Sequence, residues 1–143
     1  MFLAVDYGKK RLGLAVGQVF PQGAGVLDPG DKQVFAKIER IIQERGVEGI
    51  VVGMPLRSQG EEGTIAPEIR QFANALATQT ELPVYFEDER FTSSEAAAYL
   101  QSHEVKVSRA SGKIDEVAAI LILEQFLNRQ KENILIKPDI DPR

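Results

Sequence analysis

Short apolar runs with the composition of β-strands alternate with helical patterns along most of this chain, and that order restricts the fold more than any single motif does. Two runs, at residues 2–6 and 12–16, flank the turn-like sequence YGKKR and predict an antiparallel hairpin. A third run, at 19–27, is interrupted by a proline and two glycines, which weaken the strand pattern. Further strands are predicted at 47–53 and 82–88.

Helical spacing of apolar side chains fills the segments between these strands. Asp31 is the predicted N-cap of a first helix that ends at Gly46. A second helix is predicted around 69–76, a third after the capping box TSSE at 92–95, and a strongly apolar final one at 114–127. Three antiparallel strands followed by parallel strands joined through helices predict an α/β fold, with a mixed five-stranded sheet and helices packed on it.

Size and composition narrow the possibilities further. The chain has 143 residues, no cysteine and a formal net charge of −4. Its size predicts a single domain over 1–143. Its last residues, 134–143, are expected to form a mobile tail. The lack of cysteine excludes disulfides, Cys-based zinc sites and thiol catalysis. No apolar run approaches the ~20 residues of a membrane span, and positive charge follows the first run instead of preceding it, so we predict a cytoplasmic protein with no membrane partner.

Acidic residues stand where predicted strands and helices begin or end. Asp6 ends the first strand, the run 87–89 ends a later one, and Asp115 opens the last helix. If the two strands are neighbours in a parallel pair, their carboxyl ends lie at one edge of the sheet, where α/β folds place their sites. Carboxylates ~4 Å apart repel by about 4 kcal/mol at an effective dielectric of 20, so such a cluster needs protons or a cation.

An all-oxygen donor set favours Mg²⁺ or Mn²⁺, as one ion or as the two-ion arrangement of nucleases. Simpler interpretations remain open for each acid taken alone. Asp6 could cap a turn or pair with a following cation, and Asp115 suits the dipole at a helix start. Glu87 and Asp88 are expected to be solvated or paired with Arg90. The net negative charge also means that any nucleic-acid binding depends on local positive charge.

Four segments, LAVDYGKKRLGLAVG, IVVGMPLRSQGEEG, VYFEDERFTSSEA and GKIDEVAAILILEQFL, occur in this order over essentially the whole chain. Together they resemble the YqgF family, the pre-16S rRNA nucleases also known as RuvX or Holliday-junction-resolvase-like proteins. The resemblance implies a ribonuclease H-like fold and a metal-dependent nuclease, a hydrolase of phosphodiester bonds. It implies 5′-end maturation of pre-16S rRNA in ribosome biogenesis as the leading role, with Holliday-junction or branched-DNA resolution as the alternative.

The resemblance also implies roles for individual residues. Asp6, Glu89 and Asp115 match the family's acidic positions and are the expected catalytic and metal-binding residues, with Asp88 as the alternative to Glu89. Positively charged residues within or beside the motifs are expected to bind the phosphates of the nucleic acid: Lys9, Lys10, Arg11, Arg57, Arg90 and Lys113.

Two other functional classes are compatible with parts of the sequence. Sugar kinases and actin-like ATPases also carry an acid after the first strand, followed by a glycine and a hairpin, but they close two similar domains on a nucleotide and this chain has room for one. A non-catalytic RNA- or ribosome-binding module is the third class, although the presence of all three acids argues against it. The sequence leaves monomer and homodimer open; a resolvase that cuts two strands symmetrically is expected to be a dimer.

Overall fold

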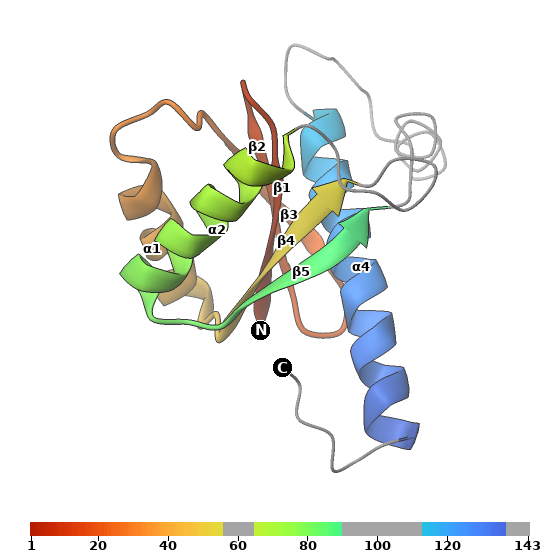
Figure 1. Cartoon of the computed structure of the whole chain (residues 1–143). Coiled ribbons are helices and arrows are strands. Elements are labelled where there is room, and N and C mark those ends of the chain that lie inside the picture. Colours follow the sequence, from red (N-terminus) through yellow and green to blue (C-terminus); the bar gives the residue numbers. More distant parts are fainter. Residues whose placement is uncertain (56–64, 90–112, 137–143) are drawn as a thin grey trace.

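The computed structural model describes residues 1–55, 65–89 and 113–136, and its core is a five-stranded sheet, drawn in Figure 1. The strands lie in the order β3-β2-β1-β4-β5. They span Phe2–Tyr7 (β1), Leu12–Gly17 (β2), Gln22–Leu27 (β3), Gly49–Pro55 (β4) and Val84–Glu89 (β5). The helices are Val34–Arg45 (α1), Ala66–Thr80 (α2) and Lys113–Ile136 (α4).

The strand directions confirm the predicted mixed sheet. β2 runs antiparallel to both β1 and β3, whereas β4 runs parallel to β1, and β5 runs parallel to β4. The condition considered for the acidic cluster, that β1 and β5 are neighbours, is not met, because β4 lies between them. The carboxyl ends of these three parallel strands still share one edge of the sheet, so acids that end β1 and β5 remain close.

The helices cover the two faces of the sheet unequally. α1 and α2 lie on one face and α4 crosses the other (Figure 1). Large aliphatic residues fill the face below α1 and α2, among them Leu3, Leu14, Ile50 and Val52. Side chains alternate between the two faces along each strand, so the residues between these lie on the face toward α4.

The face toward α4 consists of small residues over much of its area. Ala4 and Ala15 pack against apolar residues of α4. A Cβ atom at Gly13 would lie 1.9 Å from the carbonyl oxygen of Asp115, and one at Gly53 would lie 2.4 Å from Cδ1 of Ile122. Glycine at position 13 therefore lets the α4 backbone approach the sheet more closely than a side chain would permit, and Gly53 leaves space for the Ile122 side chain.

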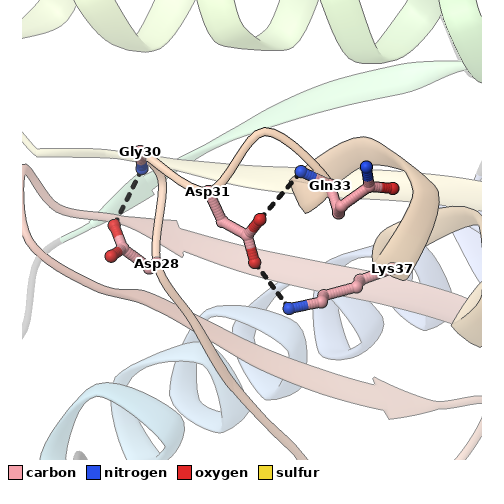
Figure 2. A network of polar contacts seen from close by, with 5 residues as sticks. All are labelled: Asp28, Gly30, Asp31, Gln33 and Lys37. Atoms are coloured by element: carbon pink, nitrogen blue, oxygen red, sulfur yellow. Dashed lines mark hydrogen bonds and ion pairs between the residues drawn. The ribbon is translucent and has the colours of Figure 1, made fainter.

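The start of α1 differs from the prediction. The N-cap is Gln33, and Asp31 lies two residues earlier. Figure 2 shows that the Asp31 carboxylate accepts a hydrogen bond from the Gln33 backbone N–H, 2.8 Å away, and pairs with Lys37. Asp31 thus organises the turn before the helix instead of capping it. Gly46 ends α1 in the left-handed conformation, with φ +65, as predicted.

Element boundaries account for the other differences. β4 continues two residues past Gly53, to Pro55, and α4 continues to Ile136, so the first three residues of the predicted tail 134–143 are helical. The predicted capping box at 92–95 and the helix after it lie outside the described residues. Among the helices that the structure describes, none is long and apolar enough to cross a membrane.

Candidate active site

Asp6 occupies the next-to-last position of β1 and is half-buried. It lies two residues after Ala4, so its side chain is on the α4 face of the sheet. Burial raises the pKa of the Asp6 carboxyl well above its usual value, and the nearby carboxylates of Glu89 and Asp115 raise it further. Three acids from distant parts of the sequence therefore interact electrostatically at one edge of the sheet.

Glu89 is the last residue of β5. It lies two residues after Glu87, which contacts α4, so its side chain is on the α4 face of the sheet, next to β4. The space it needs comes from Gly53: a Cβ atom there would lie 3.3 Å from Oε2 of Glu89. Burial raises the pKa of the Glu89 carboxyl. Asp88 belongs to the other face of the strand and is exposed. Of the two alternatives, Glu89 is thus the acid directed toward Asp6.

Asp115 lies in the first turn of α4. Its backbone passes directly above Gly13, and Gly13 is the residue paired with Asp6 across the β1–β2 ladder. The close approach of α4 to β2 is therefore what sets Asp115 beside Asp6. Its carboxylate is partly exposed, and Nη1 of Arg11 lies 3.9 Å from Oδ2 of Asp115.

The donor chemistry of Asp6, Glu89 and Asp115 fits a hard divalent cation such as Mg²⁺ or Mn²⁺. A positive ion would relieve the mutual repulsion that contributes to the raised pKa of Asp6. Among the described residues, no three His, Cys, Asp or Glu side chains converge closely enough to form a complete set of metal ligands. Binding an ion would require these carboxylates to draw together.

Comparison with known proteins identifies the family. The family model described as "RuvX: Holliday junction resolvase" matches residues 1–129. The chain belongs to the RuvX family. A Chloroflexus aurantiacus relative named "Putative pre-16S rRNA nuclease" is 36% identical over 137 residues, which cover 93% of this chain and 90% of the relative. A Koribacter versatilis protein of the same name is 36% identical over 132 residues, covering 90% and 86% of the two chains.

Solved structures share the fold of this RuvX-family chain. Thermus thermophilus RuvC matches with a TM-score of 0.57 and 15% identity, covering 92% of this chain and 96% of RuvC. T. thermophilus RuvC in complex with a Holliday junction substrate matches with a TM-score of 0.58 and 15% identity, covering 91% and 94%. The likeness confirms the predicted ribonuclease H-like α/β fold.

The structure places only some of the predicted phosphate-binding residues of this RuvX-family chain. Lys9, Lys10 and Arg11 are exposed in the turn between β1 and β2, directly after the acidic edge. Their turn is closed by a hydrogen bond of 2.9 Å from the Gly8 N–H to the Arg11 carbonyl oxygen. Lys113 begins α4. The remaining two, Arg57 and Arg90, lie outside the described residues.

Glu87 was not assigned a role from the sequence, which predicted that it is solvated or paired with Arg90. Solvation was wrong, and Arg90 lies outside the described residues. The Glu87 side chain is 1% exposed and faces α4, where it forms an ion pair with Arg129. Gln125 Nε2 donates to Oε2 of Glu87 at 2.6 Å and also to the Asp88 carbonyl oxygen at 2.6 Å. This network ties the end of β5 to α4 two residues before Glu89. Gln125 and Arg129 are four residues apart and so share one helix face, but this spacing carried no signal for Glu87, because only the packing of α4 brings them together.

Proposed function

We propose that this RuvX-family chain is a divalent-metal-dependent nuclease that cleaves the phosphodiester backbone of pre-16S rRNA near its 5′ end, in the cytoplasm. The observation that carries the proposal is the electrostatic coupling of Asp6 with Glu89 and Asp115. The names of the relatives, "Putative pre-16S rRNA nuclease", support RNA as the substrate.

The cofactor in this proposal is Mg²⁺ or Mn²⁺, as one or two ions held by Asp6, Glu89 and Asp115. Such ions activate the attacking water and stabilise the leaving oxygen of a phosphodiester when bound. The carboxylates themselves supply the negative charge, and burial of Asp6 and Glu89 keeps that charge poorly solvated until a cation neutralises it.

The surface beside these acids suits a nucleic-acid backbone. Lys9, Lys10 and Arg11 present positive charge next to Asp6 and would hold phosphates without reading sequence. Tyr7 does not contribute a stacking platform here. Its ring packs 5.0 Å from that of Phe72, and its hydroxyl donates to Glu68 on α2 at 2.9 Å. Among the described residues beside Asp6, substrate contact is therefore assigned to the cations Lys9, Lys10 and Arg11.

A second substrate, a four-way DNA junction, is favoured by two specific findings. The family description names a Holliday junction resolvase, and T. thermophilus RuvC, which shares the fold, has been solved in complex with a Holliday junction substrate. A junction resolvase would act as a homodimer so that two strands are cut symmetrically, whereas an enzyme that trims one RNA end can act as a monomer.

The test is to incubate the purified protein with Mn²⁺ and, separately, with pre-16S RNA and a four-way DNA junction. Replacing either Asp6 or Asp115 by Asn should reduce cleavage at least about a hundredfold, the usual scale for loss of a catalytic group. Glu44→Gln, the same carboxylate-to-amide change at an exposed position of α1, is the matched control. Cleavage by Asp6→Asn at the parental rate would disprove the proposal, and preference for the junction would select the second substrate.

A further inference from the structure

The first turn of α4 is attached to β3 by a charged side chain next to Asp115. Oε2 of Glu116 accepts a hydrogen bond of 2.7 Å from the backbone N–H of Gly25. At this point β3 is irregular: the β2–β3 register shifts between Leu14 and Ala15, and Gly25 has φ +105. The irregularity gives β3 a backbone donor for α4, and charge-assisted hydrogen bonds of this kind are stronger than neutral ones.

Glycine leaves the space in which this side chain and its helix lie. A Cβ atom at Gly23 would lie 2.5 Å from Cδ and Oε2 of Glu116, and one at Gly13 would lie 1.9 Å from the Asp115 carbonyl oxygen. We call Gly13, Gly23 and Gly25 the glycine socket. Gly13 is needed for the close approach of the helix backbone, and Gly23 leaves space for the end of the Glu116 side chain. Gly25 supplies the N–H and adopts a positive φ that other residues avoid.

The position of the socket links it to the acidic edge. Gly13 pairs with Asp6 across the β1–β2 ladder, so a helix seated on Gly13 has Asp115 beside Asp6. The carboxylate of Glu116 is directed to β3, which is separated from β1 by β2. Glu116 therefore belongs to the support of the site and not to the group of acids that surrounds Asp6.

The geometry points to Glu116 as a positioning residue, which holds the first turn of α4 in the glycine socket and thereby fixes Asp115 opposite Asp6. This inference rests on the proposed nuclease function of the acidic edge. A different explanation is that Glu116 only stabilises the helix start through the dipole. The helix-dipole explanation requires no particular location for α4 on the sheet. The two explanations therefore differ in one outcome: loss of Glu116 displaces Asp115 only if Glu116 is a positioning residue.

The experiment compares Glu116→Ala, Glu116→Gln and Gly23→Ala with the parent and with Glu124→Ala, an exposed acid on the same helix. Glu116→Ala loses the acceptor for Gly25, Glu116→Gln keeps an acceptor oxygen, and Gly23→Ala fills the socket while Glu116 remains. We measure Mn²⁺ affinity by calorimetry, kcat and KM for cleavage, thermal stability in EDTA, and hydrogen exchange of the α4 first turn.

Glu116→Ala and Gly23→Ala should weaken Mn²⁺ binding about tenfold or more and lower kcat by a similar factor, the scale seen when a group supporting a metal ligand is lost. KM should change little. Glu116→Gln should recover most of the loss, and Glu124→Ala should behave as the parent. Exchange at the α4 first turn should become faster in Glu116→Ala and Gly23→Ala.

Parental Mn²⁺ affinity and kcat in folded Glu116→Ala and Gly23→Ala, with only a lower melting temperature in EDTA, would overturn the positioning role and leave the helix-dipole explanation. A parent that neither binds Mn²⁺ nor cleaves would instead contradict the proposed function. The exchange measurement needs no activity, and unchanged exchange in both variants would by itself show that Glu116 does not hold α4 in the socket.

Discussion

Two aspartates in this chain have pKa values shifted in opposite directions, and the contrast distinguishes a structural acid from a candidate functional one. Asp31 accepts hydrogen bonds from Lys37 and the Gln33 N–H, which lower its pKa, so it stabilises the fold above its unfolded-state pKa and less as pH falls through its folded-state pKa. The pKa of Asp6 is raised by burial and by neighbouring carboxylates. Its ionised form therefore opposes folding.

The raised pKa of Asp6 predicts a pH-dependent gain in stability for Asp6→Asn. Folded Asp6 holds its proton more tightly than the unfolded chain does, so the parent loses stability as pH rises from about 4, the unfolded-state pKa, through the folded-state pKa. In EDTA, Asp6→Asn should therefore melt at a higher temperature than the parent at pH 7–8, and the gap should close toward pH 4. Thermal melts across this range check the sign, and a less stable Asp6→Asn at pH 7–8 would contradict it.

Residue positions were predictable from the sequence to different degrees. The ends of β1 and β5 followed to within one residue from apolar runs that stop at acids, since the strands end at Tyr7 and Glu89 and the predicted ranges ended at 6 and 88. The alternation of faces along a strand separates Glu89 from Asp88 once the strand end is known. The role of Glu87 was not predictable, because its partners Gln125 and Arg129 lie about forty residues away and only the packing of α4 brings them close. The predicted N-cap, Asp31, lies two residues before the observed one, Gln33, because a turn and a cap use the same side-chain chemistry.

At the scale of elements, α4 determines the geometry of the site. It carries Asp115, supplies Gln125 and Arg129 to the end of β5, and packs on a sheet face made of alanine and glycine. In the sequence, this face corresponds to the small residues that alternate with large ones in LGLAVG. Their period of two predicts a strand but does not show which helix packs against it. Long-range packing, not local pattern, decides which helix uses it.

Filling the contact between α4 and β2 should destabilise the protein. Gly13→Ala places a Cβ atom 1.9 Å from a backbone oxygen that cannot rotate away, so the helix must shift, at a cost of about 1–3 kcal/mol. Gly30→Ala is the matched control: its Cβ would lie 3.4 Å from Oδ1 of Asp28, and the change should be neutral or stabilise by up to about 1 kcal/mol. Urea unfolding of both variants measures the difference, and equal stabilities would refute the close packing.

The ion pair between α4 and β5 should contribute more than one on the surface. Arg129→Ala leaves the carboxylate of Glu87, which is 1% exposed, with the Gln125 amide as its side-chain donor among the described residues, and should cost about 1–3 kcal/mol of unfolding free energy. Adding Glu87→Gln should restore part of the loss, since the buried charge is then gone. Lys37→Ala, which breaks the exposed pair with Asp31, should have a smaller effect. Denaturant melts of the parent and these three variants test this order.

For the whole molecule, the net charge of −4 and the proposed nucleic-acid substrate are compatible only if positive charge is concentrated near the acids. The turn between β1 and β2 provides this, because Lys9, Lys10 and Arg11 follow Asp6 directly and are exposed. Arg40 and Arg45 are also exposed, but they lie on α1, and α1 packs on the opposite face of the sheet from α4. Charge of the same sign is thus available both beside the site and away from it.

This distribution predicts different salt dependences for two double variants. Lys9→Ala with Lys10→Ala removes two phosphate contacts, so the slope of log affinity against log salt should become shallower by about 0.7–0.9 for each charge lost. Arg40→Ala with Arg45→Ala removes the same charge and should leave the slope nearly unchanged. Binding is measured in EDTA, where cleavage is absent, with both pre-16S RNA and a four-way junction. Equal slopes for the two variants would mean that net charge, and not the turn beside Asp6, attracts the nucleic acid.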